Sequence, residues 1–171
     1  MELYVLHSLR FSDKLRPMIL DAALEIRRQV FQQEQQIPAD RDRDERDETA
    51  MQFVVMSPLK GTYPMFTAIA TARVTLTLEG FLIGRMAVLQ YYRLRNSAVG
   101  KHLMKEVLRT LRGINGDRRI YLHAQNDPDK NQDVVGFYNK LGFVPVNERF
   151  QIVGIWHQEM YHPLVKPNFY S

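Results

Sequence analysis

Runs of apolar and β-branched residues, bounded by turn-forming residues, predict seven strands along this chain. They lie at residues 2–10, 51–56, 67–78, 81–90, 119–125, 143–147 and 150–161. Glu79 and Gly80 form a turn signal between the third and fourth runs, which predicts a β-hairpin there. Ser57 and Pro58 end the second run.

Apolar positions at the helical period predict three helices. They lie at residues 12–31, 97–112 and 131–141. Ser12 or Asp13 can cap the first helix, and Pro17 falls in an early turn, where proline is tolerated. Gly113 and Gly142 follow the other two helices as stop signals.

Residues 32–50 predict a loop with one short helix at most. The element order is therefore β, α, β, β, β, α, β, α, β, β. Because strands and helices alternate only in the second half, we expect an α/β fold with a mixed, mostly antiparallel sheet of six to seven strands. Helices should cover both faces of this sheet. The 171 residues suit a single domain, residues 1–171.

Composition and charge narrow the class of protein. The net charge is +4, and Lys and Arg alternate with Asp and Glu without forming a concentrated basic stripe, so we expect no nucleic-acid partner. No apolar run is long enough to span a membrane, and the start of the chain resembles a first strand more than a signal peptide. We therefore expect a cytoplasmic protein without a membrane partner. The lack of cysteine excludes disulfides and a cysteine acyl-enzyme.

A short apolar strand, a basic loop and the start of a helix follow one another at residues 85–104. Small residues in such a loop let the backbone close around an anion, and the helix start offers free N–H groups. The loop residues are Arg95, Asn96, Ser97, Ala98, Val99 and Gly100, and Arg93 and Lys101 flank them. The spacing Arg-x-x-Ala-x-Gly resembles the acyl-CoA pyrophosphate loop of the GNAT superfamily of N-acyltransferases. The alternative is an ordinary strand–helix connection.

A second segment, residues 131–143, strengthens the resemblance. Its pattern, Asn-x-x-apolar-x-x-Phe-Tyr-x-Lys-x-Gly-Phe, is shared widely in GNAT proteins. The resemblance implies that Asn131 contacts the CoA arm and that Tyr138 lies near the CoA sulfur as a general acid. It also implies that the backbone of Met86, Ala87 and Val88 pairs with the pantetheine amides. The alternative for Tyr138 is a packing role in the core.

A third segment resembles the small ElaA-like group of GNAT proteins. It consists of Arg-Arg-Gln-Val-Phe at residues 27–31, a Glu-Gln pair at 34–35, and Asp44 and Asp47. The chain departs from this group at Gln52, where histidine is common, and at Ile152, where glutamate is usual. Neither position can supply a base here.

The residues that would bind the amine that accepts the acyl group are less defined. Glu34, Asp44 and Asp47 precede the second strand, where three carboxylates would attract a cationic amine. We expect Glu34 to be the one that relays a proton. The alternative interpretation of the charged run 40–48 is a solvated surface loop without a role in binding. Other candidate bases are His123 and His157. Gln125 shares the face of His123 on the strand 119–125, because alternate strand residues point the same way.

We therefore expect an N-acyltransferase that binds acetyl-CoA and transfers its acetyl group to a primary amine by direct attack in a ternary complex. The acceptor would be a small amine or a peptide amine, and the protein a monomer or a homodimer. We expect no metal, since the histidines do not converge. Two alternatives stay open, a non-catalytic acyl-CoA sensor and an enzyme like the acyl-homoserine lactone synthases.

Overall fold

The computed structural model describes residues 3–8, 14–58, 66–95, 98–114, 118–127, 132–152 and 154–163. It divides into two compact units. The first comprises residues 1–75 and 84–110, and the second comprises residues 76–83 and 111–171. The predicted single domain thus stays a prediction, and each unit is described by itself. No helix in the described ranges is both long and apolar enough to cross a membrane.

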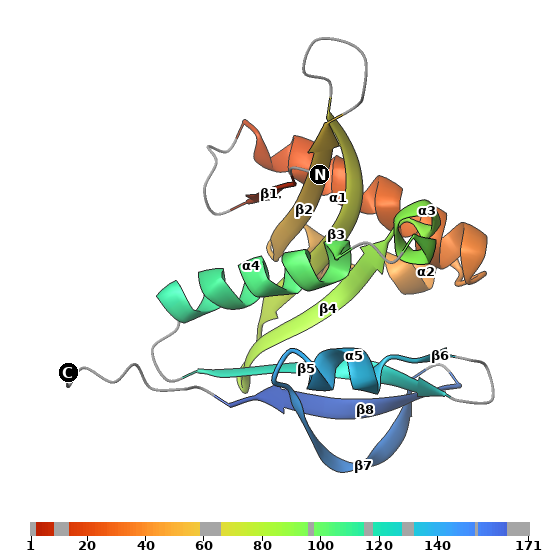
Figure 1. The fold of residues 1–171 in the computed structure, drawn as a ribbon, viewed down its shortest axis with the longest axis vertical. Coiled ribbons are helices and arrows are strands. Elements are labelled where there is room, and N and C mark those ends of the chain that lie inside the picture. The colour runs from red at the N-terminus through yellow and green to blue at the C-terminus, as the bar shows by residue number, and fades with distance from the viewer. Residues whose placement is uncertain are drawn as a thin grey trace. The chain divides into compact units, whose positions relative to one another are not determined.

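The first unit contains three antiparallel strands and most of the helices (Figure 1). Its strands are β1 (Tyr4–His7), β2 (Met51–Pro58) and β3 (Phe66–Leu76), paired in that order. Between β1 and β2 come α1 (Arg16–Arg27), the π-helix η1 (Arg28–Glu34), α2 (Ala39–Asp42) and the 3₁₀ helix η2 (Glu45–Asp47). The second half of β4 (Gly80–Val88) leads into α3 (Gln90–Leu94) and α4 (Val99–Ile114).

The second unit is built around β5 (Arg119–Asp127). The first half of β4 pairs with β5 in parallel, Gly80 opposite Arg119 and Ile83 opposite Leu122. On the other side of β5 lies β8 (Ile155–His162), which pairs in turn with β7 (Val144–Ile152), both antiparallel. The short strand β6 (Gln132–Asp133) pairs with the end of β5 and precedes α5 (Val135–Asn139).

The strand order is β1-β2-β3-β4-β5-β8-β7, with β6 beside β5. Only the β4–β5 pair is parallel among the pairings described between these strands. The prediction of an α/β fold with a mixed, mostly antiparallel sheet flanked by helices is confirmed. α1 and α4 lie on opposite sides of β2 and β3 within the first unit (Figure 1).

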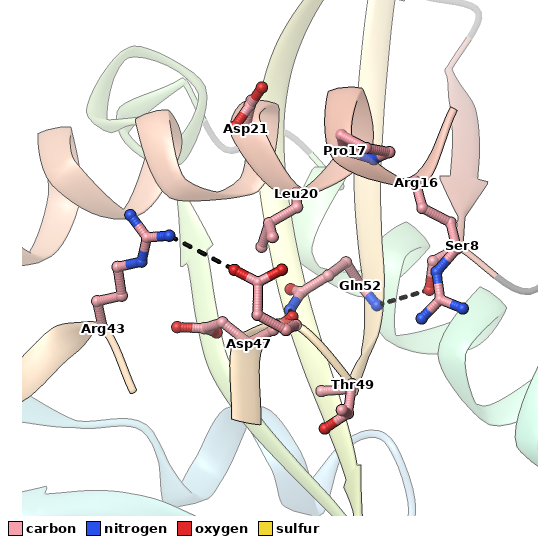
Figure 2. A pocket seen from close by; sticks show the side chains of 11 residues that line it. Ser8, Arg16, Pro17, Leu20, Asp21, Arg43, Asp47, Thr49 and Gln52 are labelled. Carbon is pink, nitrogen blue, oxygen red and sulfur yellow. Dashed lines mark hydrogen bonds and ion pairs between the residues drawn. The ribbon is translucent and has the colours of Figure 1, made fainter. Parts of the chain in front are cut away.

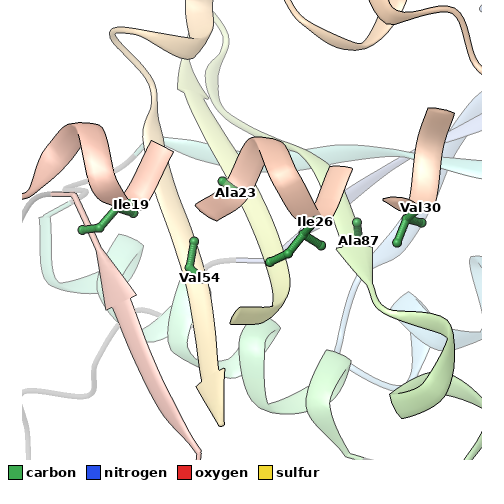
Figure 3. Packing of buried hydrophobic residues seen from close by; sticks show 6 residues of the cluster. All are labelled: Ile19, Ala23, Ile26, Val30, Val54 and Ala87. Carbon is green, nitrogen blue, oxygen red and sulfur yellow. The ribbon is translucent and has the colours of Figure 1, made fainter. Parts of the chain in front are cut away.

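The apolar side of α1 continues into η1 and packs on β2 and β4 of the first unit (Figure 3). The buried residues of this cluster are Ile19, Ala23, Ile26, Val30, Val54 and Ala87. Burying a side chain of the size of Ile26 stabilises the fold by about 1.5–3 kcal/mol. This packing fixes the course of η1, and with it the position of Glu34 at the end of η1.

Two predicted boundaries are wrong, the start of the first helix and the turn between the last two strands. α1 begins at Arg16 with Leu15 as its N-cap, and Ser12 and Asp13 lie outside the described residues. The hairpin between the last two strands turns at Gly154, with φ 74°, and not before Phe150, because β7 runs on to Ile152. Asn147, with φ 59°, lies where the register shifts, so the polar residues that suggested a turn form an irregularity within β7.

Candidate functional site

The end of β4 and the start of α4 carry most of the predicted acyl-CoA contacts. β4 pairs with β5 only as far as Ile83, and Arg85 then adopts φ 51°, an irregularity in the strand. The remaining residues, Met86 to Val88, continue β4 within the first unit. The side chain of Ala87 is buried in the core cluster, so this residue can meet a ligand only through its backbone.

The start of α4 offers the backbone donors that the sequence predicts. The carbonyl of Ala98 accepts the first helical hydrogen bond, from the His102 amide at 2.8 Å. The amides of Val99, Gly100 and Lys101 come before that bond, so they have no acceptor within the helix. The side chains of Ala98 and Lys101 are exposed, while that of Val99 is buried beneath the turn. The predicted contacts Asn96 and Ser97 lie outside the described residues.

Two arginines stand at α3, just before this helix start. The Arg95 guanidinium lies 4.0 Å from the centre of the Tyr91 ring, a cation–π contact on an exposed surface. Arg93 donates to the carbonyl of Val88 at 2.6 Å and to a Glu34 carboxylate oxygen at 2.5 Å. The structure thus brings together Arg93, predicted to bind phosphate, and Glu34, predicted for the acceptor side. The charge of Glu34 is compensated by this pair.

The acidic run at 40–48 is only partly a solvated loop. Arg27, fully buried at the end of α1, donates to Asp42 Oδ1 at 2.9 Å and to Asp47 Oδ1 at 2.6 Å. Asp42 and Asp47 are each 2% exposed, whereas Asp40 and Arg43 are exposed. Arg27 therefore ties the loop to α1. The sequence signal was present, because Arg27 falls in phase with the apolar positions of its helix.

A second layer of this network reaches the sheet. Arg73 on β3 donates to Asp44 at 2.6 Å and to Asp47 at 2.8 Å, and Arg85 lies 3.4 Å from Asp44. Burial alone would raise the pKa of Asp47, but hydrogen bonds from Arg27 and Arg73 outweigh it and lower this pKa well below its usual range. Burial would likewise raise the pKa of Asp44, but the hydrogen bond and the charge of Arg73 outweigh it and lower this pKa. Both predicted acceptor-side aspartates already bind arginines.

In the second unit, Tyr138 is held between β5 and β7. The amide of Val134 donates to the carbonyl of Gln125 at 3.1 Å, which docks the start of α5 on β5. The Tyr138 ring makes edge contacts with Phe137 and Phe143, at centroid distances of 5.1 and 5.8 Å. Burial raises the pKa of Tyr138 to about 12. Its neighbour in the motif, Asn131, lies outside the described residues.

The histidines that the sequence left as alternatives lie together on one face of β5 and β8. His123 is opposite Glu159 and Gln125 is opposite His157. Within this face the His123 Nε2 atom lies 3.8 Å from Glu159 Oε2. Burial lowers the pKa of His123, although the Glu159 charge opposes this, and burial also lowers the pKa of His157. The sequence did not indicate the Glu159 partner, because the pairing depends on strand register.

A separate cavity of about 770 Å³ lies in the first unit, between the start of α1 and the start of β2 (Figure 2). Gln52 lines it and is 2% exposed, and its amide nitrogen donates to the Asp47 carbonyl at 3.1 Å. Asp21 and Arg43 also line the cavity, and Figure 2 shows the ion pair of Arg43 with Glu48. Of the predicted site residues, Asp47 lines this cavity.

The comparison with protein families decides the identity of the fold. The model of a family described as an acetyltransferase (GNAT) domain matches residues 42–163. The chain belongs to the GNAT acetyltransferase family. Its sequence is 34% identical over 89 residues to Protein ElaA of Escherichia coli, over 52% of this chain and 53% of ElaA. The chain thus spans about half the length of the curated relatives it matches.

Solved structures extend the likeness to the whole fold. The crystal structure of Escherichia coli ElaA is 30% identical, has a TM-score of 0.68, and covers 95% of this chain and 99% of its own. The predicted resemblance to the ElaA-like group is therefore confirmed. An acyl-CoA N-acyltransferase from Pseudomonas aeruginosa is 23% identical, with a TM-score of 0.69 over 95% of this chain and 99% of its own. The PaiA N-acetyltransferase of Thermoplasma acidophilum, solved with coenzyme A, is 13% identical, with a TM-score of 0.57 over 95% and 100%. The last two share the fold.

Proposed function

We propose that this protein is a cytoplasmic N-acyltransferase that moves an acetyl group from acetyl-CoA to a primary amine. Membership of the GNAT acetyltransferase family supports the reaction class. The observation that carries the proposal is the start of α4, where three backbone amides have no acceptor within the helix and Ala98 and Gly100 are small. Two arginines, Arg93 and Arg95, come shortly before it in the chain. This is the chemistry that a pyrophosphate requires.

The donor side of the proposal uses charge and backbone together. The amides that begin α4 and the positive end of its dipole favour a phosphate anion. Arg93, Arg95 and Lys101 add cationic side chains, and the backbone of β4 offers peptide groups to the pantetheine arm. The full set proposed to bind acetyl-CoA is Met86, Ala87, Val88, Arg93, Arg95, Asn96, Ser97, Ala98, Val99, Gly100, Lys101, Asn131 and Tyr138.

The chemical step follows from the residues available. With no cysteine in the chain, the amine attacks the thioester directly and no acyl-cysteine forms. The nitrogen forms a bond to the acyl carbon, the carbon–sulfur bond breaks, and Tyr138 donates its phenolic proton to the leaving sulfur. The attacking nitrogen loses one proton in this step, and an equivalent proton restores the phenol. Because burial raises the pKa of Tyr138 to about 12, the phenol carries this proton at neutral pH.

On the acceptor side, a small amine or a peptide amine is proposed to bind near Glu34, Asp44, Asp47 and Gln125, with Glu34 relaying a proton. The ion pairs of these carboxylates distinguish a structural role from a role in binding or proton transfer. Asp47 is nearly inaccessible and its charge is compensated by Arg27 and Arg73, so its contribution is to hold the loop. Glu34 is easier to release from its ion pair than Asp47, because the side chain of its partner Arg93 is 40% exposed whereas Arg27 is fully buried.

A charge substitution at Ala98 tests the donor site without harming the helix. Aspartate at this position, the N-cap of α4, is a good helix cap, so Ala98→Asp should keep or raise Tm. The same carboxylate would stand where the pyrophosphate binds, so calorimetry should find CoA affinity lowered by at least 100-fold relative to wild type, an order-of-magnitude expectation from placing like charges in contact.

The matched control is Ala98→Asn, which caps the helix equally well without a charge. It should retain most of the CoA affinity, within roughly tenfold, since each 1.4 kcal/mol of lost contact is a factor of ten. Equal CoA binding by wild type and a folded Ala98→Asp variant would show that the start of α4 is an ordinary strand–helix connection.

A further inference from the structure

A histidine and a glutamate face each other across two strands of the second unit. His123 on β5 is paired in register with Glu159 on β8, and the facing ring nitrogen and carboxylate oxygen, Nε2 and Oε2, lie 3.8 Å apart. The side chains are 29% and 18% exposed, so a solute can reach them while most of their surface is dry. An imidazole beside a carboxylate is suited to accept a proton, because the carboxylate stabilises the imidazolium that forms.

Glu159 is itself held in place. Its other oxygen, Oε1, accepts a hydrogen bond from Arg119 at 2.6 Å. The Arg119 guanidinium in turn lies over two rings of the same face, 5.4 Å from the centre of Tyr121 and 5.9 Å from that of Tyr161. Tyr121 is anchored by a 2.9 Å hydrogen bond between its hydroxyl and that of Thr77. The carboxylate is thus oriented before any substrate binds.

The ring of His123 is also fixed by its neighbours. The Phe150 ring on β7 meets it edge-on at a centroid distance of 5.0 Å, and the Tyr121 ring lies at 6.0 Å. The charged or titratable groups that act on His123 are Glu159 and His157 on β8, Glu79 in the turn before β4, and Arg119 through Glu159. Burial lowers the pKa of His123, which favours the neutral ring that a proton acceptor requires.

We propose that His123 is the general base of the acyl transfer and that Glu159 is its positioning residue. This inference rests on the proposed function and assigns the base that activates the acceptor amine to His123 in place of Glu34, whose carboxylate is paired with Arg93. An ammonium group cannot attack a thioester until it loses a proton. Nε2 faces Glu159, so the other ring nitrogen, Nδ1, takes that proton and frees the lone pair of the amine.

The protons balance over the whole step. One proton passes from the ammonium to His123, and the neutral amine then attacks the acyl carbon. The second proton passes from the attacking nitrogen toward the leaving sulfur, where Tyr138 supplies the donor. The products are the N-acetyl amine, free CoA thiol and an imidazolium, which returns its proton to water.

His157 is the natural comparison because it lies on the same face. Its Nδ1 is 2.8 Å from the carbonyl of Ile155, two residues away, which fixes the ring to its own strand. Among the interactions of the described residues, it forms no ion pair with a carboxylate. A substitution there changes the same surface without removing the histidine–carboxylate pair, so His157→Gln is a matched control.

The kinetic test uses acetyl-CoA and the primary amine that the wild type acetylates fastest from a panel of aliphatic amines, amino acids and peptides. In wild type and His157→Gln, kcat/KM for the amine should rise with pH and then level off. His123→Gln should lower kcat by about 10²-fold or more, with KM for acetyl-CoA unchanged. Its rate should keep rising toward the pKa of the free amine, about 10.4 for a lysine-like amine, and His123→Asn should behave in the same way.

A titration followed by NMR tests the pair without relying on turnover. Removing the carboxylate charge in Glu159→Gln should lower the pKa of His123, and in kinetics it should shift the acid limb to lower pH. An unchanged His123 pKa would overturn the positioning role of Glu159. Normal turnover by wild type, together with an undiminished kcat and a pH plateau in His123→Gln, would show that His123 is not the base. The proposed function would stand in that case. If wild type acetylates no amine, the proposed function itself fails and the base falls with it.

Discussion

Burial raises the pKa of Tyr138 to about 12, so ionisation of this phenol cannot limit activity in the neutral range. If Tyr138 protonates the leaving thiolate, Tyr138→Phe should lower kcat by about 10²–10⁴-fold. The ring contacts with Phe137 and Phe143 are kept in this variant, so CoA affinity and Tm should change little. Initial rates of CoA thiol release measure the effect. The control is Tyr4→Phe, at an exposed position on β1. A wild-type kcat in Tyr138→Phe would show that Tyr138 has only a packing role.

Asp47 is the residue on which the fold of the acidic loop depends most. Breaking a buried ion pair from one side costs about 3–5 kcal/mol, because a charge is left uncompensated. Asp47→Asn should therefore lower Tm by about 6–20 °C in a protein of this size. Asp40→Asn, at an exposed aspartate in the same run, should stay within about 0.5 kcal/mol of wild type. Equal Tm for the two variants would contradict the structural role of the network.

The same aspartate predicts how stability depends on pH. Its pKa is lowered in the folded protein, so it stabilises the fold at pH values above its unfolded pKa of about 3.9. That contribution is lost as the pH falls below about 4. Chemical denaturation between neutral pH and about pH 3 should show a steeper loss in wild type than in Asp47→Asn. Parallel curves would indicate that Asp47 is not paired in solution.

At the scale of elements, the sequence predicts local patterns well and pairing poorly. The apolar period of α4 and the β-branched run of β3 are local signals, and both elements are present near their predicted bounds. The π-helix η1 continues the apolar face of α1 through Val30. The amide of Gln35 donates to the carbonyl of Val30, five residues earlier, and no residue pattern in the sequence predicts this spacing. The β7–β8 turn was misplaced because Asn147 and its neighbours have turn chemistry but form a register shift within β7, between Val146 and Phe150.

The predictability of the site follows the same division. The start of α4 and the α5 segment with Tyr138 are contiguous motifs, so the sequence located them. The histidine–glutamate pair and the arginine network depend on register and packing between distant residues. Arg119 and Glu159 are 40 positions apart, and Arg73 and Asp47 are 26 apart. Such pairs carry no signal in a single sequence.

At the scale of the whole molecule, the question is whether the chain transfers an acetyl group or only binds acyl-CoA. The family model covers residues 42–163 and defines the fold, but a fold can host binding as well as catalysis. Gln52 and Ile152 stand where the resemblance to the ElaA-like group leads one to expect titratable residues. The alternative is a protein that binds acyl-CoA without turnover, for which the 171-residue chain should bind CoA and release no thiol in the presence of an amine.

The most direct test is to incubate the full chain with acetyl-CoA and a panel of primary amines. Free thiol is followed over time, and the amines are then examined by mass spectrometry. We expect thiol release that depends on an amine, matched by the mass of one acetyl group on that amine. Its rate should fall by about 10²-fold or more in Tyr138→Phe and in His123→Gln. Tight CoA binding by calorimetry with no acetylated product from any amine would contradict it, and would instead indicate an acyl-CoA sensor.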